Sequence, residues 1–540
     1  MSSPTSKQVR TTRGSGWPFA NRPRRLTTAT CLLVHAALCC ALAAAANGQA
    51  PQANHTQTIE RVVHVAPFGA GGERYVYVPF DVPRRAARVH VSYDYARAGG
   101  ANTLDLGVFD ARSDGPGAAV GARGFRGWSG GRRSEFFITR EEATPGYLAG
   151  ELPAGRWRVV LGLYRVAPAG VDVKVKVVIE TEEKGPGRRA AGPRRAHNTA
   201  GTSGRSTSAG RKVSGRNLRW FAGDLHMHTV HSDGDWTVRG LAAAAREAGL
   251  DFIFVTDHNT ASHHREVDEA DGGSRQTLVM RGEEVTTYGG HANAWGLSAG
   301  AFVDFRVRPG DAVGMSQVAA HAHRLGALIS VNHPSALCGG CDWSYGDAIK
   351  EFDAVEVWNG EWDGTDESAL KTWDGLLQRG LRPTAIASSD THRAQNPVGR
   401  PTTHVAAVQL TQAALLNSIR RGRIYLTAER GRPLVSFEAW ARAGVSDARS
   451  LPGDEVRLTT PGTLLFFVGV RDAPPGATAS LVTEGGVIRT VPFDSGPNAV
   501  PTKIEVECER GGYYRLEVRD REGKMLALTN PIYVKVGKRR

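Results

Sequence analysis

The stretch Trp220-Phe221-Ala222-Gly223-Asp224-Leu225-His226-Met227-His228 runs from an apolar segment directly into two histidines. In an extended strand, residues two apart point to the same side, so His226 and His228 can bind one ion together. The same spacing recurs at His321 and His323, but that pair falls in a predicted helix over residues 316–325. Residues two apart in a helix diverge by about 200°, so that pair cannot share a metal. Position at a strand end therefore marks residues 220–228 as a candidate metal site.

Four further strand-like runs also lead into histidines or carboxylates. Residues 252–255 lead into Thr256-Asp257-His258, residues 278–280 into Gly282-Glu283-Glu284, residues 329–331 into Asn332-His333-Pro334, and residues 385–387 into Ser389-Asp390-Thr391-His392. Short apolar runs alternate with helical patterns from residue 218 to about residue 430, which predicts a parallel α/β fold. In a barrel of parallel strands the carboxyl ends meet at one rim. These side chains are therefore expected to surround one point.

The residue types of this set indicate metal chemistry. Imidazoles mixed with carboxylates suit Zn, Mn or Fe, and several carboxylates allow bridging between two or three divalent ions. Such ions make a bound water acidic enough to attack an ester near neutral pH. The set therefore predicts a metal-dependent hydrolase.

The order and spread of these motifs resemble the PHP (polymerase and histidinol phosphatase) metallohydrolase family over roughly residues 218–430. The resemblance implies a distorted (β/α)7 barrel with a di- or trinuclear metal centre. It implies three groups of metal ligands: His226, His228 and Asp390 with bridging Glu284; His291 and His333; and Asp233, His258 and His392. Glu284, His291 and Asp257 form the expected catalytic set, with Asp257 able to orient its neighbour His258 instead of binding metal. Glu283 stays open as the alternative to Glu284.

Two flanking motifs narrow the resemblance. Residues 125–131 (Phe-Arg-Gly-Trp-Ser-Gly-Gly) and 529–533 (Thr-Asn-Pro-Ile-Tyr) look like parts of the exported, carbaryl-hydrolase-like branch of that family. The resemblance implies hydrolysis of a small phosphoester first, and of a carbamate or carboxylic ester second. An ordinary amidohydrolase barrel ranks behind, because it would need a strand-borne bridging lysine. The candidate substrate contacts, all near motif ends, are His264, Asn293, Trp295, Asn359 and Arg393.

The charge distribution argues against a nucleic-acid partner. The formal net charge is +13, of which residues 1–50 carry +6 and residues 183–219 carry +9, leaving −2 for the rest. The folded body is therefore close to neutral, and a basic groove is not supported.

The composition predicts five segments in the chain. Arg22, Arg24 and Arg25 precede an apolar run over residues 26–46, which is typical of a secretory signal, with an uncleaved membrane anchor as the alternative. We predict a leader over residues 1–50, an N-terminal β-sandwich over 55–182, a basic flexible linker over 183–216, the barrel over 217–430 and a C-terminal β-sandwich over 431–540. The mature protein is expected to be secreted or periplasmic, with no membrane span after signal removal.

Two points stay open from the sequence. Cys338 and Cys341 are compatible with a local disulfide or with two free thiols. A rival of another class is an inactive secreted protein whose sandwiches bind glycans or envelope polymers. Trp128, Trp157 and Tyr164 could then be contacts, although the alternation around them favours a place in the core.

Overall fold

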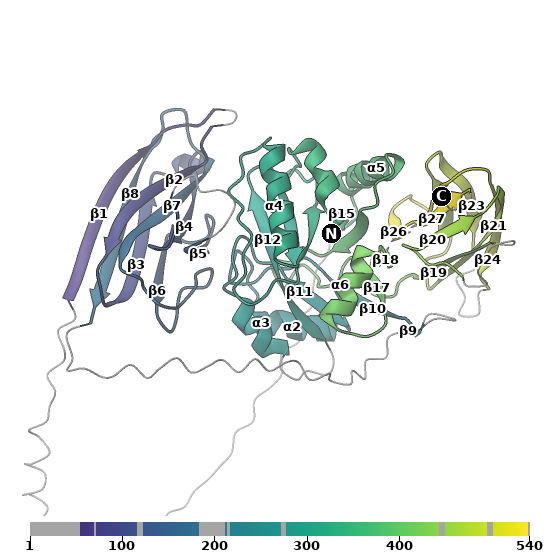
Figure 1. The fold of residues 1–540 in the computed structure, drawn as a ribbon, viewed down its shortest axis with the longest axis horizontal. Helices are drawn as coiled ribbons and strands as arrows, with labels where there is room; N and C mark the ends of the chain where they lie inside the picture. Colours follow the sequence, from purple (N-terminus) through teal and green to yellow (C-terminus); the bar gives the residue numbers. More distant parts are fainter. Residues whose placement is uncertain are drawn as a thin grey trace, which may run out of the picture. The chain divides into compact units, whose positions relative to one another are not determined.

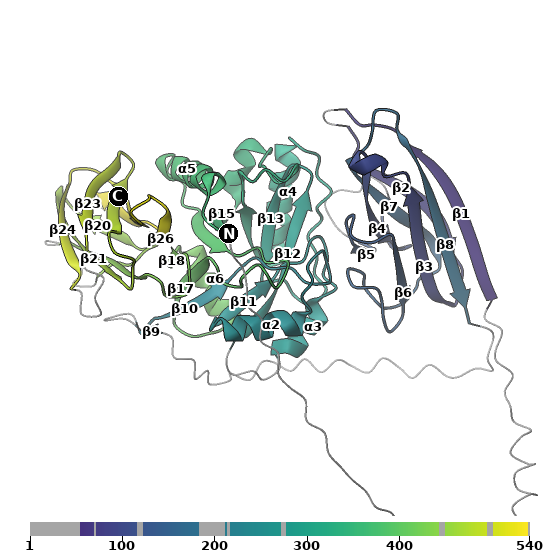
Figure 2. The same ribbon diagram turned by 180° about the vertical axis from the view of Figure 1, so that it is seen from behind.

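A computed structural model describes residues 55–69, 72–115, 123–182, 211–212, 217–271, 277–441, 449–493 and 500–537 (Figures 1 and 2). The predicted leader and nearly all of the predicted linker lie outside these ranges. Among the described residues, no helix has the length and apolar composition that a bilayer-crossing segment needs.

The N-terminal part of the described chain consists of two four-stranded antiparallel sheets. One has the order β1 (His55–Val65), β8 (Val171–Thr181), β3 (Ala86–Tyr95), β6 (Glu135–Thr139), and the other β2 (Tyr75–Val82), β7 (Gly155–Arg165), β4 (Thr103–Phe109), β5 (Phe125–Trp128). A short 3-10 turn, η1 (Ala98–Gly100), precedes β4. The burial of β8 alternates along the strand, as expected for one face on a core and one in solvent. Leu104 and Leu106 from one sheet and Val89 and Val91 from the other share one apolar core. Trp157 is fully buried there, as the alternation favoured.

The central part combines strands with helices. Its strands are β9 (Arg211–Lys212), β10 (Arg219–Asp224), β11 (Phe252–Val255), β12 (Leu278–Thr287), β13 (Gly290–Trp295), β14 (Leu328–Asn332), β15 (Ala354–Asn359), β16 (Thr384–Ser388), β17 (Thr402–Ala407) and β18 (Ile424–Thr427). Its helices are α2 (Val238–Glu247), α3 (His264–Asp271), α4 (Ala312–Arg324), the 3-10 helix η2 (Gly346–Glu351), α5 (Gly364–Gln378) and α6 (Gln412–Arg420) (Figure 1). The fold is therefore mixed α/β, as predicted.

The central sheet is not uniformly parallel. Strands β10–β11–β12 and β14–β15–β16 pair in parallel, whereas β13 is antiparallel to both β12 and β14, and β17 is antiparallel to β10. The cause at β13 is the tight turn at Tyr288-Gly289, because a connection of two residues can join only antiparallel strands.

The central strands do not form a closed barrel in the described residues, because no backbone pairing joins β16 to β17. The hydroxyl of Thr403 links these two strands instead, donating to Ala387 O (2.6 Å) and accepting from Ala387 N (3.0 Å). The predicted distorted barrel is therefore not found as a closed barrel in these ranges.

The C-terminal strands extend the central sheet. Strand β18 pairs with β26 (Met525–Thr529), and the sheet continues through β25 (Gly512–Arg519), β22 (Thr478–Thr483) and β23 (Gly486–Pro492), with β27 (Ile532–Val536) and β20 (Glu455–Leu458) at the side. A second sheet has the order β19 (Leu434–Ala441), β21 (Gly462–Arg471), β24 (Thr502–Cys508). Phe437 and Phe466 of that sheet share a core with Leu516 and Ala527 of the first. The residue boundaries of separate domains stay a prediction.

Candidate metal centre

The predicted ligands meet at the strand ends of the central sheet. His226 and His228 follow β10, His258 follows β11, His333 follows β14, and Asp390 and His392 follow β16, while Glu284 and His291 face each other from β12 and β13. Three groups of them each have ligand atoms within 4.8 Å of one another: His226, His228 and Glu284; His226, His333 and Asp390; and His228, Asp233, His258 and His392. These groups contain eight of the nine predicted ligands, and the ninth, His291, joins them through its Nδ1, which lies 3.3 Å from Glu284 Oε1.

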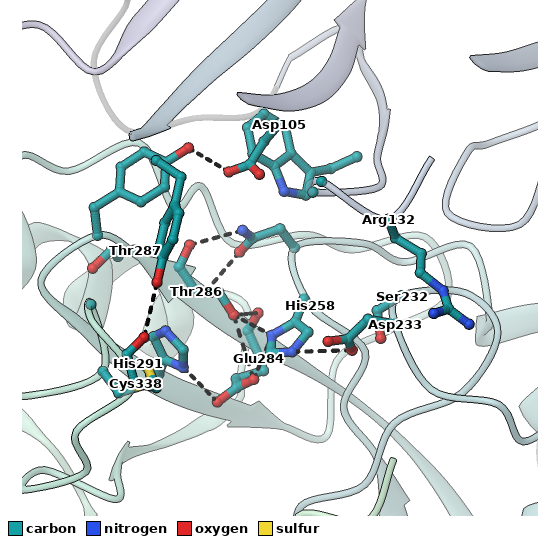
Figure 3. A pocket seen from close by; sticks show the side chains of 18 of the residues that line it. Asp105, Arg132, Ser232, Asp233, His258, Glu284, Thr286, Thr287, His291 and Cys338 are labelled. Atoms are coloured by element: carbon teal, nitrogen blue, oxygen red, sulfur yellow. Dashed lines mark hydrogen bonds and ion pairs between the residues drawn. A yellow bond between two sulfur atoms is a disulfide. The ribbon is translucent and has the colours of Figure 1, made fainter. Parts of the chain in front are cut away.

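Glu284 lies at the centre of this cluster and is buried (Figure 3). Its Oε1 lies 3.1 Å from His226 Nε2, 3.3 Å from His291 Nδ1 and 3.4 Å from His333 Nε2, and its Oε2 lies 2.6 Å from His258 Nδ1 and 3.6 Å from His228 Nε2. Burial alone would raise the pKa of Glu284, but the histidines around it hold that pKa well below its usual value. Glu284 is therefore a charged carboxylate placed to bridge two ligand groups.

Two aspartates complete the cluster. Asp390 Oδ1 lies 3.0 Å from His228 Nε2 and 3.4 Å from His226 Nε2. Asp233 Oδ1 lies 3.2 Å from His392 Nε2 and 3.4 Å from His258 Nε2. Each carboxylate oxygen thus sits between two imidazole nitrogens.

Several of these atoms are buried without a hydrogen bond, namely His226 Nε2, His228 Nε2, His291 Nδ1, His333 Nδ1, Asp233 Oδ1 and Asp390 Oδ1. Buried polar atoms in folded proteins nearly always have partners, so such a concentration of unbonded ones needs a cause. A divalent cation satisfies nitrogen and oxygen donors of this kind. The residues present therefore fit a divalent metal.

Two supporting residues were missed in the sequence. Glu356, buried in β15, lies with Oε1 3.1 Å from His226 Nδ1, and its Oε2 accepts from the backbone N of His333 (3.0 Å). Asn332 Nδ2 donates to Glu284 Oε1 (2.9 Å). A bond from His226 Nδ1–H to Glu356 directs the Nε2 lone pair to the cluster. An acidic residue inside the apolar run 352–358 was the sequence feature that could have revealed Glu356.

Asp257 and Glu283 lie beside the cluster without facing it. Asp257 accepts from Thr229 N (2.7 Å), Thr229 Oγ1 (2.6 Å) and Ser232 Oγ (2.6 Å), so it fixes the loop after β10. Glu283 points to the other side of β12, where its Oε2 accepts from Val303 N (2.8 Å). Burial raises the pKa of Glu283 well above its usual value, which favours the protonated form of this carboxyl group.

A cavity of about 600 Å³ opens above the cluster. One side is lined by Asp233, His258, Glu284, His291, His333, Asp390 and His392. The other side comes from the N-terminal sheets and includes Asp105, Trp128, Arg132 and Tyr164 (Figure 3). Cys338 and Cys341 form a disulfide at the cavity wall, with Cys341 close to His291 and His333.

None of the five predicted substrate contacts lines this cavity. Trp295 is buried with its Nε1 donating to Leu225 O, Asn293 is fully buried, and His264 accepts from Gly300 N. Asn359 donates to Glu356 and Asp390 from outside the cavity, and Arg393 is exposed. The five residues were predicted because they lie close to motifs in the sequence, but this closeness does not place them on the cavity wall.

No protein-family model matches the chain, and no curated protein matches it. Among solved structures, the chain is similar to a two-domain protein from Bacteroides vulgatus containing a predicted PHP-like metal-dependent phosphoesterase. The match has 20% identity and a TM-score of 0.33 and covers 58% of this chain and 96% of that one. It is also similar to an amidohydrolase from Chromobacterium violaceum, with 16% identity and a TM-score of 0.25 over 33% of this chain and 90% of that one. Both likenesses are distant.

Metal binding at this cluster is expected to release protons and to strengthen as the pH rises. Burial would lower the pKa of His258, but Glu284 and Asp233 raise it to about 9, and neighbouring carboxylates also raise the pKa of His226 and His392. Between pH 6.5 and 9 the metal-free cluster therefore holds protons that a metal must displace, and affinity should rise roughly tenfold per pH unit for each proton displaced. Calorimetric titration of Zn²⁺ in two buffers of different ionisation heat measures the release. An affinity that is flat over this range would contradict the expectation.

Proposed function

We propose that this chain is a metal-dependent hydrolase of ester-type bonds, acting on phosphoesters first and on carbamate or carboxylic esters second. The observation that carries the proposal is the buried cluster of unbonded imidazole and carboxylate atoms at the floor of a cavity large enough for a small molecule. We further propose that it is a PHP-type enzyme of the exported, carbaryl-hydrolase-like branch, with a (β/α)7 arrangement in its central part.

The roles of the side chains follow from their contacts. When bound, two or three divalent ions (Zn, Mn or Fe) would supply Lewis acidity and an acidified water. The proposed ligands are His226, His228, Asp233, His258, Glu284, His291, His333, Asp390 and His392. Among them the Glu284 carboxylate, which contacts histidines through both of its oxygens, would be the ligand shared between ions. Asp257 holds the loop that carries His228 and Ser232, so it acts by positioning. Glu356 keeps the Nδ1 proton on His226.

The proposal also includes the cellular compartment of the enzyme. We place it in the periplasm or outside the cell, with residues 1–50 as its signal, a small-molecule substrate and no nucleic-acid partner. The disulfide between Cys338 and Cys341 supports this, because disulfides persist mainly in oxidising compartments.

The test is a metal and activity analysis of purified residues 51–540. We expect metal ions to copurify, and we expect p-nitrophenyl phosphate, its diester or a naphthyl carbamate to be hydrolysed. Turnover should stop with a chelator and return with Zn²⁺, Mn²⁺ or Fe²⁺. The proposal would be contradicted if the protein retained no metal and hydrolysed none of the three substrates. In that case, binding of a polysaccharide by the same preparation would favour the inactive binding protein.

A further inference from the structure

The cavity wall opposite the metal cluster is built by strands of the N-terminal sheet. In β4, Leu104 and Leu106 point into the core of the sandwich, so Asp105 between them points the other way, to the cavity. Its neighbour across the ladder is Gly162 in β7. A Cβ at Gly162 would lie 2.2 Å from Tyr288 Oη and 2.6 Å from the Trp128 ring. Glycine at this position therefore allows both rings to close around Asp105.

Asp105 has no cationic partner among the described residues. Its Oδ2 accepts from Tyr288 Oη (2.6 Å), and the only positive group that acts on it is the more distant His258. Burial raises the pKa of Asp105 to about 6, against the opposing effects of the Tyr288 bond and His258. At neutral pH Asp105 thus carries a partly desolvated negative charge with which no described residue forms a direct ion pair.

Other charged groups nearby are already paired. Asp110, directly after the same strand, has Arg126 Nη1 3.3 Å from its Oδ2 and also binds Arg112. Arg132, which lines the same cavity, donates to Asp235 Oδ1 (2.9 Å). Among the described acidic residues of this wall, Asp105 is therefore the one that could form an ion pair with a ligand.

Aromatic rings surround the carboxylate. Tyr75 stacks on Tyr288 with ring centroids 5.7 Å apart and meets Trp128 edge-on at 6.3 Å, and all three line the cavity with Tyr164. The faces of such rings attract cations, most strongly where water is excluded. Tyr288 already accepts a cation, because Arg74 Cζ lies 5.6 Å from its centroid.

We propose that Asp105, Trp128 and Tyr164 of this wall, together with Tyr288 from the β12–β13 turn, form a subsite for an ammonium-type cation. The preferred ester then carries a cationic group at the end remote from the bond held at the metal cluster, across the cavity from Glu284 (Figure 3). This inference rests on the proposed function for its substrate, but the cation site itself does not require turnover.

The test compares two phosphodiesters of the same shape: p-nitrophenyl phosphorylcholine, whose choline group is cationic, and p-nitrophenyl 3,3-dimethylbutyl phosphate, whose alkyl group is uncharged. The metal-loaded protein is expected to prefer the choline ester by about tenfold in kcat/KM, the size of a good aromatic and ionic contact. Asp105→Asn keeps the shape and the acceptor for Tyr288 but removes the charge, so the ratio of the two kcat/KM values should fall to near one. Asp81→Asn, which changes an exposed acid on β2 of the same sheet, is the matched control and should leave the ratio unchanged.

Calorimetric binding of choline supplies the readout that is independent of hydrolysis. Choline should bind to the Asp81→Asn protein as to the unaltered chain and at least about tenfold more weakly to Asp105→Asn. If both esters are cleaved equally and choline binding does not depend on Asp105, the subsite is wrong and the hydrolase stands. If neither ester is cleaved but choline binding depends on Asp105, the cation site stands and choline phosphodiesters are not the substrates, whereas the hydrolase itself fails only in the metal and substrate test given above.

Discussion

Glu284→Gln is expected to lower kcat/KM for any hydrolysed ester by roughly 10³-fold or more, since metal-assisted stabilisation is worth several kcal/mol. The carboxylate of Glu284 lies among His226, His228, His258, His291 and His333, and an amide would remove its charge and turn one acceptor into a donor. Bound metal per chain, measured by elemental analysis, should fall together with the activity.

Glu283→Gln is the matched control, one residue away on the same strand. Glu283 accepts from Val303 N on the far side of β12, and burial favours its uncharged form, so glutamine keeps its shape and an acceptor for Val303 N. Activity and metal content are expected to stay within about twofold, as for an isosteric replacement. Equal loss in both variants would mean that Glu284 has no special place in the site.

The double variant His226→Ala, His228→Ala is expected to retain little metal and to show no turnover above background. Both Nε2 atoms are buried and lack hydrogen bonds, and both point to Glu284 and Asp390. Metal content and hydrolysis of the best ester from the substrate screen are the measurements. Full turnover in this variant would rule out the proposed mechanism.

The chain contains its own control for this pair of histidines. His321 and His323 have the same spacing but lie on α4, where His323 Nε2 contacts Asp353 Oδ2 (2.9 Å). The double variant His321→Ala, His323→Ala should therefore keep its metal and its activity. A comparable loss in this second variant would show that histidine removal acts through stability and not through the site.

The strand-end rule located the candidate site because it depends on local features. Apolar runs that end in histidine or carboxylate can be read from neighbouring residues, and parallel strands such as β10 and β11 do bring His228 and His258 together. The directions of the strands were harder to predict from the sequence. The sequence Tyr288-Gly289-Gly290 contains the turn that makes β13 antiparallel, and the glycine pair was the available sign of a hairpin.

The opposite cavity wall could not be predicted from the sequence. Asp105 is a polar residue in an alternating strand, and such a residue ordinarily faces solvent. Only the packing of the N-terminal sheet near Tyr288, more than 180 positions away, turns it into a cavity residue. The partner of Glu356 could not be predicted for a related reason, since His226 lies 130 positions earlier in the chain.

The bond network of Asn530 has a consequence for how this protein can be divided. Its side chain accepts from Ala385 N and donates to Ala385 O, both at 2.8 Å, which fastens the C-terminal strands to β16, the strand that leads to Asp390. A fragment ending near residue 430 would lose these two hydrogen bonds. It would also lose β26, which would leave β18 as an unpaired edge strand that is prone to aggregation. The C-terminal strands thus support β16 and, through it, the histidine cluster. We therefore expect truncation of these strands to disturb the metal site as well as the C-terminal sheet.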